Sequence, residues 1–407
     1  MTDPEIILQE SQYIMPTYRR SVVIFEKGRG AYLYDIKGKK YLDCISGIAT
    51  CPLGHAHPVV TSALTKQAKK LINVTNLFYT QPQVELAKKL VSIAGFDGKV
   101  FFSNSGTEAI EAAIKLTRKY AQKKEIIAVE NAFHGRTLGA LSATHKARFR
   151  EPFEPLVPGF KHIAYDSPSA LVKAITDDTA AFFMEPILGE AGVILPSRGY
   201  LKEIREICSQ RGILMVVDEI QTGMGRTGTF FAYQHEGIMP DIITLAKGLA
   251  NGIPIGATIA RAEIANAFEP GDHGSTFGGN SLATAVANAV VDFIIEKNLA
   301  EYAATAGAML EEKLHSLKKN TPLIKEIRAK GLMIAIEVNA LAKELVAQCL
   351  SKGLVINNTS DNTLRLLPPL IIGKRDIKKC ITILSNILIG SDNKRGRIKP
   401  QPQEAIL

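Results

Sequence analysis

The distribution of apolar residues along the chain predicts a sheet of mostly parallel β-strands. Between about residue 99 and residue 260, short apolar runs recur, and each is followed by a polar or helical stretch. None of these runs alternates apolar with polar residues, as a strand wetted on one face would. Near-continuous apolar strands interleaved with helices are typical of a parallel sheet covered on both faces. The predicted strands are residues 100–102, 126–129, 180–184, 213–217, 242–245 and 255–259.

The helix after the first of these strands is predicted to begin at Thr107, a good N-cap residue. Glu108 and Glu111 lie in its first turns and basic residues lie towards its end, which complements the helix macrodipole. Apolar residues from Ala109 to Tyr120 recur at helical spacing. One face of this helix is therefore expected to pack on the sheet.

The pattern changes after residue 282. A long helical stretch runs to about Lys319, and residues 327–338, another helix and an apolar run at 364–372 follow it. We interpret these elements as a smaller α/β domain that includes parts of residues 1–49. The predicted division is an N-terminal segment at 1–49, a large domain at 50–285, a small domain at 286–390 and a flexible tail at 391–407.

Composition fits a globular protein that works in a reducing compartment. The 407 residues are 46% hydrophobic and 22% charged, which does not suit a disordered chain. We find neither an N-terminal signal-like segment nor an uncharged run of 18 residues, so neither secretion nor a membrane span is indicated. The five cysteines are odd in number and show no C-x-x-C spacing, so we expect a cytoplasmic protein without a disulfide framework.

The net charge of +9 could suggest a nucleic-acid partner. Lysine and arginine are instead scattered over helices on faces that look solvated, without a zinc-finger or RNA-binding signature. We therefore expect no nucleic-acid partner, and we interpret the charge as attraction for anionic substrates and a phosphate-bearing cofactor.

Two of the predicted strands end near side chains that suit one cofactor. Asp218 ends the run at 213–217, and Lys247 follows the run at 242–245. Ligands of such sheets bind beyond the carboxyl ends of the strands. Burial lowers the pKa of a lysine and makes it a nucleophile that can form a Schiff base, while an aspartate can hold a protonated ring nitrogen. Pyridoxal 5′-phosphate (PLP) requires this pair of groups.

Two further stretches are compatible with the same cofactor. Gly106 and Thr107 would offer backbone N–H groups to a phosphate at a helix N-terminus, although a plain N-cap also explains them. After another strand, Phe133 could stack on a pyridine ring and Arg136 could grip a carboxylate. The alternative for that pair is a core phenylalanine beside a surface arginine.

Two other motifs are rejected as functional signals. Residues 223–228 match the dinucleotide pattern G-x-G-x-x-G, but they do not start directly at a strand end and no regular helix follows. His55 and His57 lack a nearby third ligand, so we expect no metal site.

Taken together, the motifs resemble the class III PLP-dependent aminotransferases over about residues 15–372. They are Ser-Gly-Thr-Glu-Ala at 105–109, Phe-His-Gly-Arg-Thr at 133–137, Glu-Pro-x-x-Gly-Glu at 185–190, Asp-Glu-x-Gln-Thr-Gly-x-Gly-Arg-Thr-Gly at 218–228 and Ala-Lys-Gly at 246–248. Within that class, residues 15–19, 252–257, 273–280 and 364–370 are similar to acetylornithine aminotransferases.

The resemblance implies an α/β architecture of PLP fold type I and a homodimer with the active sites at the subunit interface. Lys247 and Asp218 are the expected catalytic residues. Glu190 and Arg365 resemble the family's gate, in which the glutamate masks the arginine for an ω-amine donor and releases it for glutamate. The residues expected to bind PLP are Gly106, Thr107, Phe133, Asp218, Glu219, Ile220, Gln221, Lys247 and Thr276, the last reaching the partner's cofactor. Those expected to bind substrate are Arg136, Ser275, Glu190, Arg365 and Tyr18.

The reaction implied is transfer of the δ-amino group of N2-acetylornithine to 2-oxoglutarate, giving N-acetylglutamate 5-semialdehyde and glutamate, as in arginine biosynthesis. The alternative is another ω-amine donor, namely succinylornithine, ornithine, 4-aminobutyrate or a carrier-protein-linked lysine precursor. Three places depart from the family pattern: Thr50-Cys51-Pro52 stands for a usual Val-Asn, Leu188 for a common Gln, and Ile48 for the Tyr of ornithine aminotransferases. The last departure favours acetylornithine over ornithine.

Overall fold

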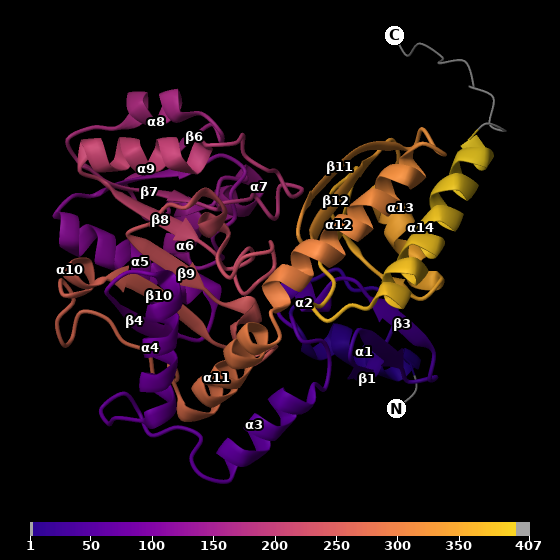
Figure 1. Cartoon of the computed structure of the whole chain (residues 1–407), viewed down its shortest axis with the longest axis horizontal. Helices are drawn as coiled ribbons and strands as arrows, with labels where there is room; N and C mark the ends of the chain where they lie inside the picture. The colour runs from indigo at the N-terminus through magenta and orange to yellow at the C-terminus, as the bar shows by residue number, and fades with distance from the viewer. Residues whose placement is uncertain (1–2, 396–407) are drawn as a thin grey trace.

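A seven-stranded sheet forms the centre of the larger body of the molecule (Figure 1). The computed structural model describes residues 3–395. The strand order is β4-β10-β9-β8-β7-β5-β6, and only β10 runs antiparallel to its neighbours, so the predicted mostly parallel sheet is confirmed. The strands are β4 (Gly98–Ser103), β5 (Glu125–Val129), β6 (Phe160–Ile163), β7 (Thr179–Met184), β8 (Leu214–Asp218), β9 (Ile242–Leu245) and β10 (Gly256–Arg261).

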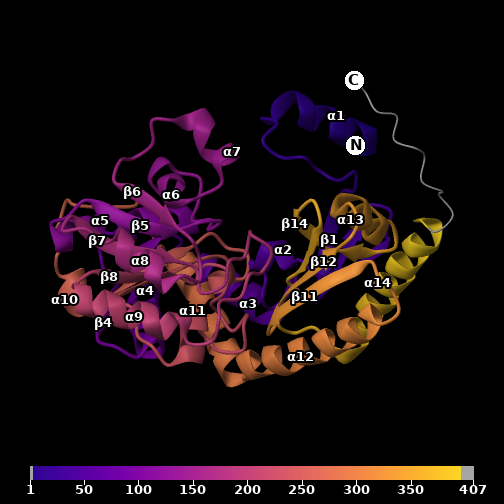
Figure 2. The same cartoon turned by 90° about the horizontal axis from the view of Figure 1, so that it is seen from above.

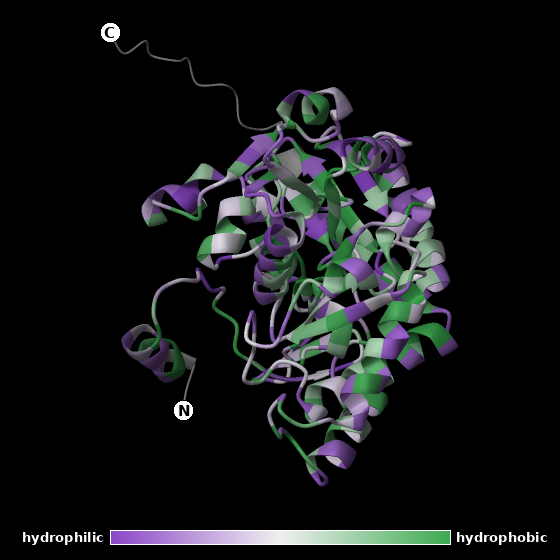
Figure 3. Ribbon diagram, turned by 90° about the vertical axis from the view of Figure 1, so that its left-hand side faces the viewer, coloured by the Kyte–Doolittle hydropathy of each residue, from purple (hydrophilic) through white to green (hydrophobic). Residues whose placement is uncertain are grey.

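The central strands are apolar throughout because helices cover both faces of the sheet. Successive side chains of a strand point to opposite faces, so Phe182 and Phe183 of β7 enter two different hydrophobic clusters. Helix α5 (Gly106–Ala121) packs in the cluster of Phe183, whereas α9 (Tyr200–Arg211) and α11 (Ser281–Glu296) pack in that of Phe182. Figure 3 shows the resulting hydrophobic interior beneath helices with hydrophilic outer faces.

Two details differ from the sequence-based expectations. Ser105, and not Thr107, is the N-cap of α5, and its hydroxyl accepts a hydrogen bond from the Glu108 N–H. The Thr107 hydroxyl is used elsewhere, because it accepts from the backbone N–H groups of Arg136 and Thr137. Strand β6 was not predicted, since its sequence Phe-Lys-His-Ile has two polar residues at its centre and it lies at the edge of the sheet.

The smaller body contains two four-stranded sheets. One is antiparallel in the order β11-β12-β15-β14, formed by β11 (Ile324–Lys330), β12 (Met333–Val338), β15 (Thr363–Leu366) and β14 (Asn357–Ser360). The other joins the N-terminal β1 (Phe25–Arg29), β2 (Tyr32–Asp35) and β3 (Lys40–Asp43) to β13 (Leu354–Val355). The N-terminal segment therefore pairs with a strand more than 300 residues away. The exact domain boundaries stay a prediction.

The other helices surround these sheets, and α12 (Leu299–Lys318) continues from α11 into the smaller body (Figures 1 and 2). Asn298, with φ 48°, separates the two helices. Helix α14 (Lys374–Arg395) ends past the predicted start of the tail at residue 391, and residues 396–407 lie outside the described residues. The remaining helices are α1 (Asp3–Tyr13), α2 (Ser46–Ala49), α3 (Pro58–Ala68), α4 (Gln81–Ala94), α6 (Leu138–Ala143), α7 (Ala147–Arg150), α8 (Pro168–Ala174), α10 (Ala262–Ala265), α13 (Ala342–Ser351), η1 (Glu151–Phe153), η2 (Ala232–Glu236) and η3 (Lys247–Ala250).

Within residues 3–395, none of the helices combines the length and the apolar character needed to span a lipid bilayer.

Candidate active site

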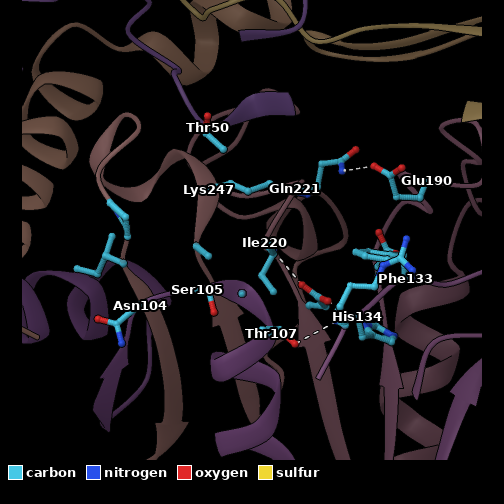
Figure 4. Close-up of a pocket in the computed structure, with 18 of the residues that line it drawn as sticks. Thr50, Asn104, Ser105, Thr107, Phe133, His134, Glu190, Ile220, Gln221 and Lys247 are labelled. Atoms are coloured by element: carbon cyan, nitrogen blue, oxygen red, sulfur yellow. Dashed lines mark hydrogen bonds and ion pairs between the residues drawn. The ribbon is translucent and has the colours of Figure 1, made fainter. Parts of the chain in front are cut away.

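A cavity of about 440 Å³ lies beyond the carboxyl ends of the central strands (Figure 4). This edge of a parallel sheet is where ligands of α/β proteins bind. Strand β8 ends at Asp218 and its neighbour β9 ends at Leu245, and Asp218 pairs with Thr244. The pairing explains why Asp218 and Lys247 reach one cavity. The other lining residues come from the loops after β4, β5, β7, β8 and β9 and from Thr50.

Asp218 is buried and has one clear ionic partner. Its Oδ2 lies 2.7 Å from Nδ1 of the buried His134, and its Oδ1 accepts a hydrogen bond from the Ile220 N–H at 3.0 Å. Burial lowers the pKa of His134, but the hydrogen bond and charge of Asp218 outweigh burial, so the pKa is raised above its usual value. Nε2 of His134 has no hydrogen-bond partner among the described residues. The arrangement places negative charge at the cavity wall and fixes its orientation.

Lys247 opens the turn η3 in a backbone conformation that is unusual for a lysine, with φ 41°. Burial lowers its pKa, and the positive charge of Arg365 acts in the same direction, against the opposing effect of Glu190. No hydrogen bond to its Nζ is found in residues 3–395. A desolvated amine without a partner at a strand end is suited to nucleophilic attack on a carbonyl carbon.

The N-terminus of α5 forms the opposite end of the cavity, where Figure 4 shows Ser105 and Thr107. Within the described chain, the backbone N–H groups of Gly106 and Thr107 have no acceptor, so this end can bind an anion. Close packing leaves no room for larger residues here. A Cβ on Gly106 would lie 2.8 Å from Cδ1 of Ile220, and one on Gly256 would lie 2.3 Å from the Ser105 carbonyl oxygen.

Glu185, which directly follows β7, holds two cavity loops together. One carboxylate oxygen accepts from the Phe133 N–H at 2.9 Å, and the other accepts from the Gly189 N–H at 3.2 Å. Burial raises the pKa of Glu185 to about 7, and the charge of Asp218 adds to the effect. The loop of Phe133 and the loop of Glu190 are therefore fixed to one buried carboxyl group.

Arg365 and Glu190 form an ion pair at the cavity. Nη1 of the fully buried Arg365 lies 2.6 Å from Oε1 of Glu190 and also donates to Gln221 Oε1 at 3.1 Å. Gln221 in turn donates to Glu190 at 3.2 Å (Figure 4). Burial alone would raise the pKa of Glu190, but the charge of Arg365 and its hydrogen bonds lower the pKa below its usual value. Nη2 of Arg365 has no partner among the described residues.

Arg136 lies on the cavity wall and is exposed to solvent. Its guanidinium carbon is 3.8 Å from the centre of the Phe149 ring and 5.5 Å from that of Phe133. The stacking holds this cation in place, and no carboxylate in the described part of the chain pairs with it.

Five of the expected site residues do not line the cavity of the single chain. Arg365 is fully buried behind its partner Glu190, which does line the cavity. Ser275 accepts hydrogen bonds from Asn104 Nδ2 and the Gly278 N–H, and Thr276 beside it is exposed. Tyr18 is 74% exposed in the segment after α1. Glu219 is buried below the cavity, where it accepts from Tyr233 N–H.

Sequence reasoning assigned no binding role to several residues that line the cavity. Glu185 directly follows β7 and could have been found by its place at a strand end, like Asp218. Asn104 directly follows β4 and carries the same signal. Thr50 had no such signal, because it reaches the cavity from a segment far away in the sequence.

Comparison with known proteins identifies the family. Residues 13–388 match the model of the family described as Aminotransferase class-III. An acetylornithine aminotransferase from Methanopyrus kandleri is 49% identical over 93% of this chain and 98% of that protein. One from Aquifex aeolicus is 47% identical over 92% of this chain and the whole of that protein.

The solved structures that this chain resembles are also aminotransferases. The ornithine aminotransferase of Toxoplasma gondii has a TM-score of 0.94 at 35% identity, with 97% of each chain covered. The acetylornithine aminotransferase of Elizabethkingia anophelis has a TM-score of 0.86 at 35% identity, with 96% of this chain and all of that chain covered. A second structure of the Toxoplasma gondii enzyme is described with PLP at partial occupancy in its active site.

The residues of the cavity fit this cofactor. The free N–H groups of α5 suit its phosphate, the buried carboxylate of Asp218 suits its ring nitrogen, and the unpartnered amine of Lys247 suits its aldehyde. These groups occur together in one cavity whose volume accommodates a small cofactor and a substrate. The chain therefore belongs to the class III aminotransferases, which are enzymes that depend on pyridoxal 5′-phosphate.

Proposed function

We propose that the enzyme transfers the δ-amino group of N2-acetylornithine to 2-oxoglutarate. The main support is that relatives described as acetylornithine aminotransferases are 44–49% identical over 92–95% of this chain. The cavity is consistent with such substrates, since it combines a free cation at its wall with a masked one deeper inside. The products are N-acetylglutamate 5-semialdehyde and glutamate, as in arginine biosynthesis.

The cofactor would be held at three points. Gly106 and Thr107 bind the phosphate through their N–H groups, and Asp218 pairs with the ring nitrogen. Phe133 covers one face of the ring. His134 keeps Asp218 in place through its 2.7 Å hydrogen bond, so the carboxylate cannot turn away from the ring. Around these residues, Ile220, Gln221 and Glu219 complete the segment that follows β8.

When bound, the cofactor withdraws electrons from the carbon that carries the amino group and carries this group between the two substrates. Lys247 anchors the cofactor through Nζ. With its amine free, Lys247 would act as the base that takes the proton from the δ-carbon of the donor, because its pKa is lowered. The buried floor of the cavity keeps water from competing for that proton.

The carboxylates of the two substrates would bind to different arginines. Arg136 would bind the carboxylate of acetylornithine with its guanidinium fork. For this donor, Glu190 stays paired with Arg365, so the buried cation is not available to the substrate. For glutamate and 2-oxoglutarate, Glu190 would separate from Arg365, and Arg365 would bind the α-carboxylate. Ser275 and Tyr18 are proposed to contact the substrate from the exposed side.

The first experiment is Lys247→Ala together with a donor panel. The variant is expected to lose the visible absorbance of the cofactor held through Lys247 and to lose transamination. Full turnover in the variant would overturn the assigned mechanism. The wild type is then compared with acetylornithine, succinylornithine, ornithine, 4-aminobutyrate and a carrier-linked lysine precursor, with kcat/KM as the measure. A higher kcat/KM for any of the others would replace the proposed donor.

Ornithine is the second candidate because the neighbour with a TM-score of 0.94 is an ornithine aminotransferase. Ile48, 40% exposed, stands where ornithine aminotransferases carry a tyrosine, and this argues for the acetylated donor. The donor panel decides between the two.

We also propose that the enzyme is a cytoplasmic homodimer. The exposed Thr276 would reach the phosphate of the partner's cofactor, which explains why it lies outside the cavity of its own chain.

A further inference from the structure

Lys146 is a half-buried cation next to the Glu190–Arg365 pair whose role is not explained above. It is the residue before α7, and its Nζ donates a hydrogen bond to the backbone carbonyl oxygen of Glu190 at 3.1 Å. An ammonium group has three donors, and a neutral carbonyl compensates poorly for the loss of water. Burial and the charges of Arg148 and Arg365 lower the pKa of Lys146. Among residues 3–395, no carboxylate pairs with this cation in the present state of the gate.

Glu190 is able to supply such a partner by turning its own side chain. The amine of Lys146 contacts the main chain of Glu190, so the carboxylate needs only rotation about its side-chain bonds, without movement of the backbone. Glutamate has three such torsions, and those between tetrahedral carbons exchange among staggered states. In the present state the carboxylate lies on Arg365 and Gln221 instead.

The gate proposed above creates a charge problem that this rotation solves. When the α-carboxylate of glutamate occupies Arg365, Glu190 loses its main partner inside the protein. An unpaired carboxylate whose side chain is only 29% exposed is unfavourable, because it has lost part of its water and has no counter-ion. Pairing with Lys146 restores one partner to each of the four charged groups.

The other cations around the gate are less suited to this task. Lys247 interacts with Glu190 electrostatically, but a carboxylate resting on Lys247 would hold the proton that this base must move. Arg136 and Arg148 both stack on the ring of Phe149, at 3.8 Å and 4.8 Å from its centre. Neither makes a hydrogen bond to Glu190 in the described part of the chain.

We propose that Lys146 is a positioning residue of the gate, which receives the carboxylate of Glu190 when glutamate or 2-oxoglutarate binds to Arg365. This inference rests on the gate described under the proposed function. It assigns the open state a definite structure, with the ion pair Glu190–Lys146 in place of Glu190–Arg365. The amine donor does not open the gate, so Lys146 affects only one of the two half-reactions.

The test compares the two half-reactions in Lys146→Met. Purified holoenzyme is mixed with glutamate or with the best amine donor, and the loss of the cofactor's visible absorbance is followed in a single turnover. We expect the half-saturating glutamate concentration to rise about tenfold, as for the loss of one favourable charge pair, and that of the donor to stay within about twofold. Lys146→Arg should restore glutamate to within about threefold, because it keeps the charge.

A double-mutant comparison separates positioning from a merely structural role. In Glu190→Ala the carboxylate that Lys146 receives is absent, so adding Lys146→Met should change glutamate binding no further. Arg148→Met is the matched control, since it removes a neighbouring exposed cation and should leave both half-reactions unchanged. Equal effects of Lys146→Met on both substrates, or additive effects in Glu190→Ala, would overturn the role of Lys146.

Arg365→Leu distinguishes this failure from a failure of the gate. If that variant binds glutamate as the wild type does, Arg365 is not the carboxylate site and the inference falls with the gate. If it binds glutamate weakly while Lys146→Met behaves as the wild type, the gate stands and only the role of Lys146 is wrong. The identity of the amine donor does not enter either comparison, because glutamate is the probe.

Discussion

At the scale of single residues, the site depends on carboxyl groups with different surroundings. Glu185 and Glu219 are buried, and burial raises the pKa of each to about 7. The charge of Asp218 acts on both glutamates, and Asp218 has His134 as an ionic partner at 2.7 Å. Hydrogen bonds from backbone N–H groups hold both glutamates, so they fix loops, whereas Asp218 faces the cavity.

The raised pKa of Glu219 has a consequence for stability. In the unfolded chain this carboxyl group ionises near its ordinary pKa of 4.5, whereas the folded protein keeps the proton until about pH 7. Between these values the folded state binds more protons, so the free energy of unfolding falls as pH rises, by roughly 3 kcal/mol in total. We expect Glu219→Gln to remove this fall, because the amide stays neutral and can still bond to Thr222 and Tyr233.

Urea denaturation at pH 5 and pH 8, with saturating PLP, measures the effect. Relative to the wild type, Glu219→Gln should gain stability at pH 8 and little at pH 5. Glu206→Gln on the exposed side of α9 is the control and should keep the wild-type dependence. A parallel pH dependence of Glu219→Gln and the wild type would show that the carboxyl group is ionised in the folded protein.

Arg136 gives a second prediction at this scale. Arg136→Ala removes a bidentate contact to the donor's carboxylate, worth about 2–3 kcal/mol, so kcat/KM for the donor should fall roughly 30- to 150-fold. The affinity for PLP should change little, because Arg136 stacks on Phe149 and bonds none of the buried groups. Steady-state kinetics and PLP titration check both quantities.

Arg148→Ala removes a similar stacking contact and serves as the control. Equal loss of donor binding and PLP binding in Arg136→Ala would contradict the role assigned to Arg136.

At the scale of elements, the N-terminus of α5 is positioned by β10 packing against it. Gly256 begins β10 opposite Ser103, and a Cβ there would lie 2.3 Å from the Ser105 carbonyl oxygen and 2.5 Å from Ser103 Oγ. Because one of these atoms belongs to the backbone, the N-cap of α5 must move to make room. We expect Gly256→Ala to weaken PLP binding by about tenfold or more, since the N–H groups of Gly106 and Thr107 are displaced.

Titration of the cofactor-free enzyme with PLP, followed by absorbance, gives the affinity. Gly390→Ala is the matched control, because no atom lies within 4 Å of its added Cβ and the residue is inside α14. That variant should bind PLP normally and be slightly more stable, since alanine favours helix more than glycine does. Normal PLP affinity in Gly256→Ala would show that α5 tolerates the shift.

The elements also show how far the sequence alone could lead. All six apolar runs became strands, because burial on both faces of the sheet favours apolar residues at most positions of its central strands. Strand β6 was missed since an edge strand with Lys161 and His162 carries no such signal. The N-cap of α5 was placed at Thr107 instead of Ser105, because both residue types cap helices and only the fold shows that Thr107 is used by the loop at 136–137.

For the site, the sequence was informative where a residue follows a strand directly. Asp218 and Lys247 could be paired because adjacent parallel strands end at the same edge. The links through Glu185 to Phe133 and through Ser275 to Asn104 join segments far apart along the chain. No local pattern encodes such contacts, and the hydrogen bond of Lys146 to Glu190 belongs to the same kind.

At the scale of the whole molecule, an exposed apolar surface remains beside the loop of Thr276. Residues 71–79, between α3 and α4, contain Leu77 at 84% and Tyr79 at 100% exposure, and Phe277 is 62% exposed. Asn76 donates hydrogen bonds to the carbonyl oxygens of Ser275 and Gly278, so the two loops lie side by side. Contiguous apolar exposure of this kind marks an interaction surface. A second copy of the chain is the partner that the proposed role of Thr276 requires.

The proposed dimer leads to a prediction that links assembly to catalysis. In sedimentation experiments the wild type should have twice the chain mass of 44.2 kDa. The double substitution Leu77→Asp and Phe277→Asp should give the monomer mass, because two carboxylates buried at an interface are costly, whereas the same residues are exposed in the monomer. The monomer should lose PLP affinity and turnover at least tenfold, since Thr276 of the partner no longer reaches the phosphate.

Leu341→Asp is the control, because it changes an exposed apolar side chain before α13 in the smaller body. This variant should leave mass and activity unchanged. A fully active enzyme of 44.2 kDa would show that each chain completes its own site, and the phosphate would then be bound by α5 alone.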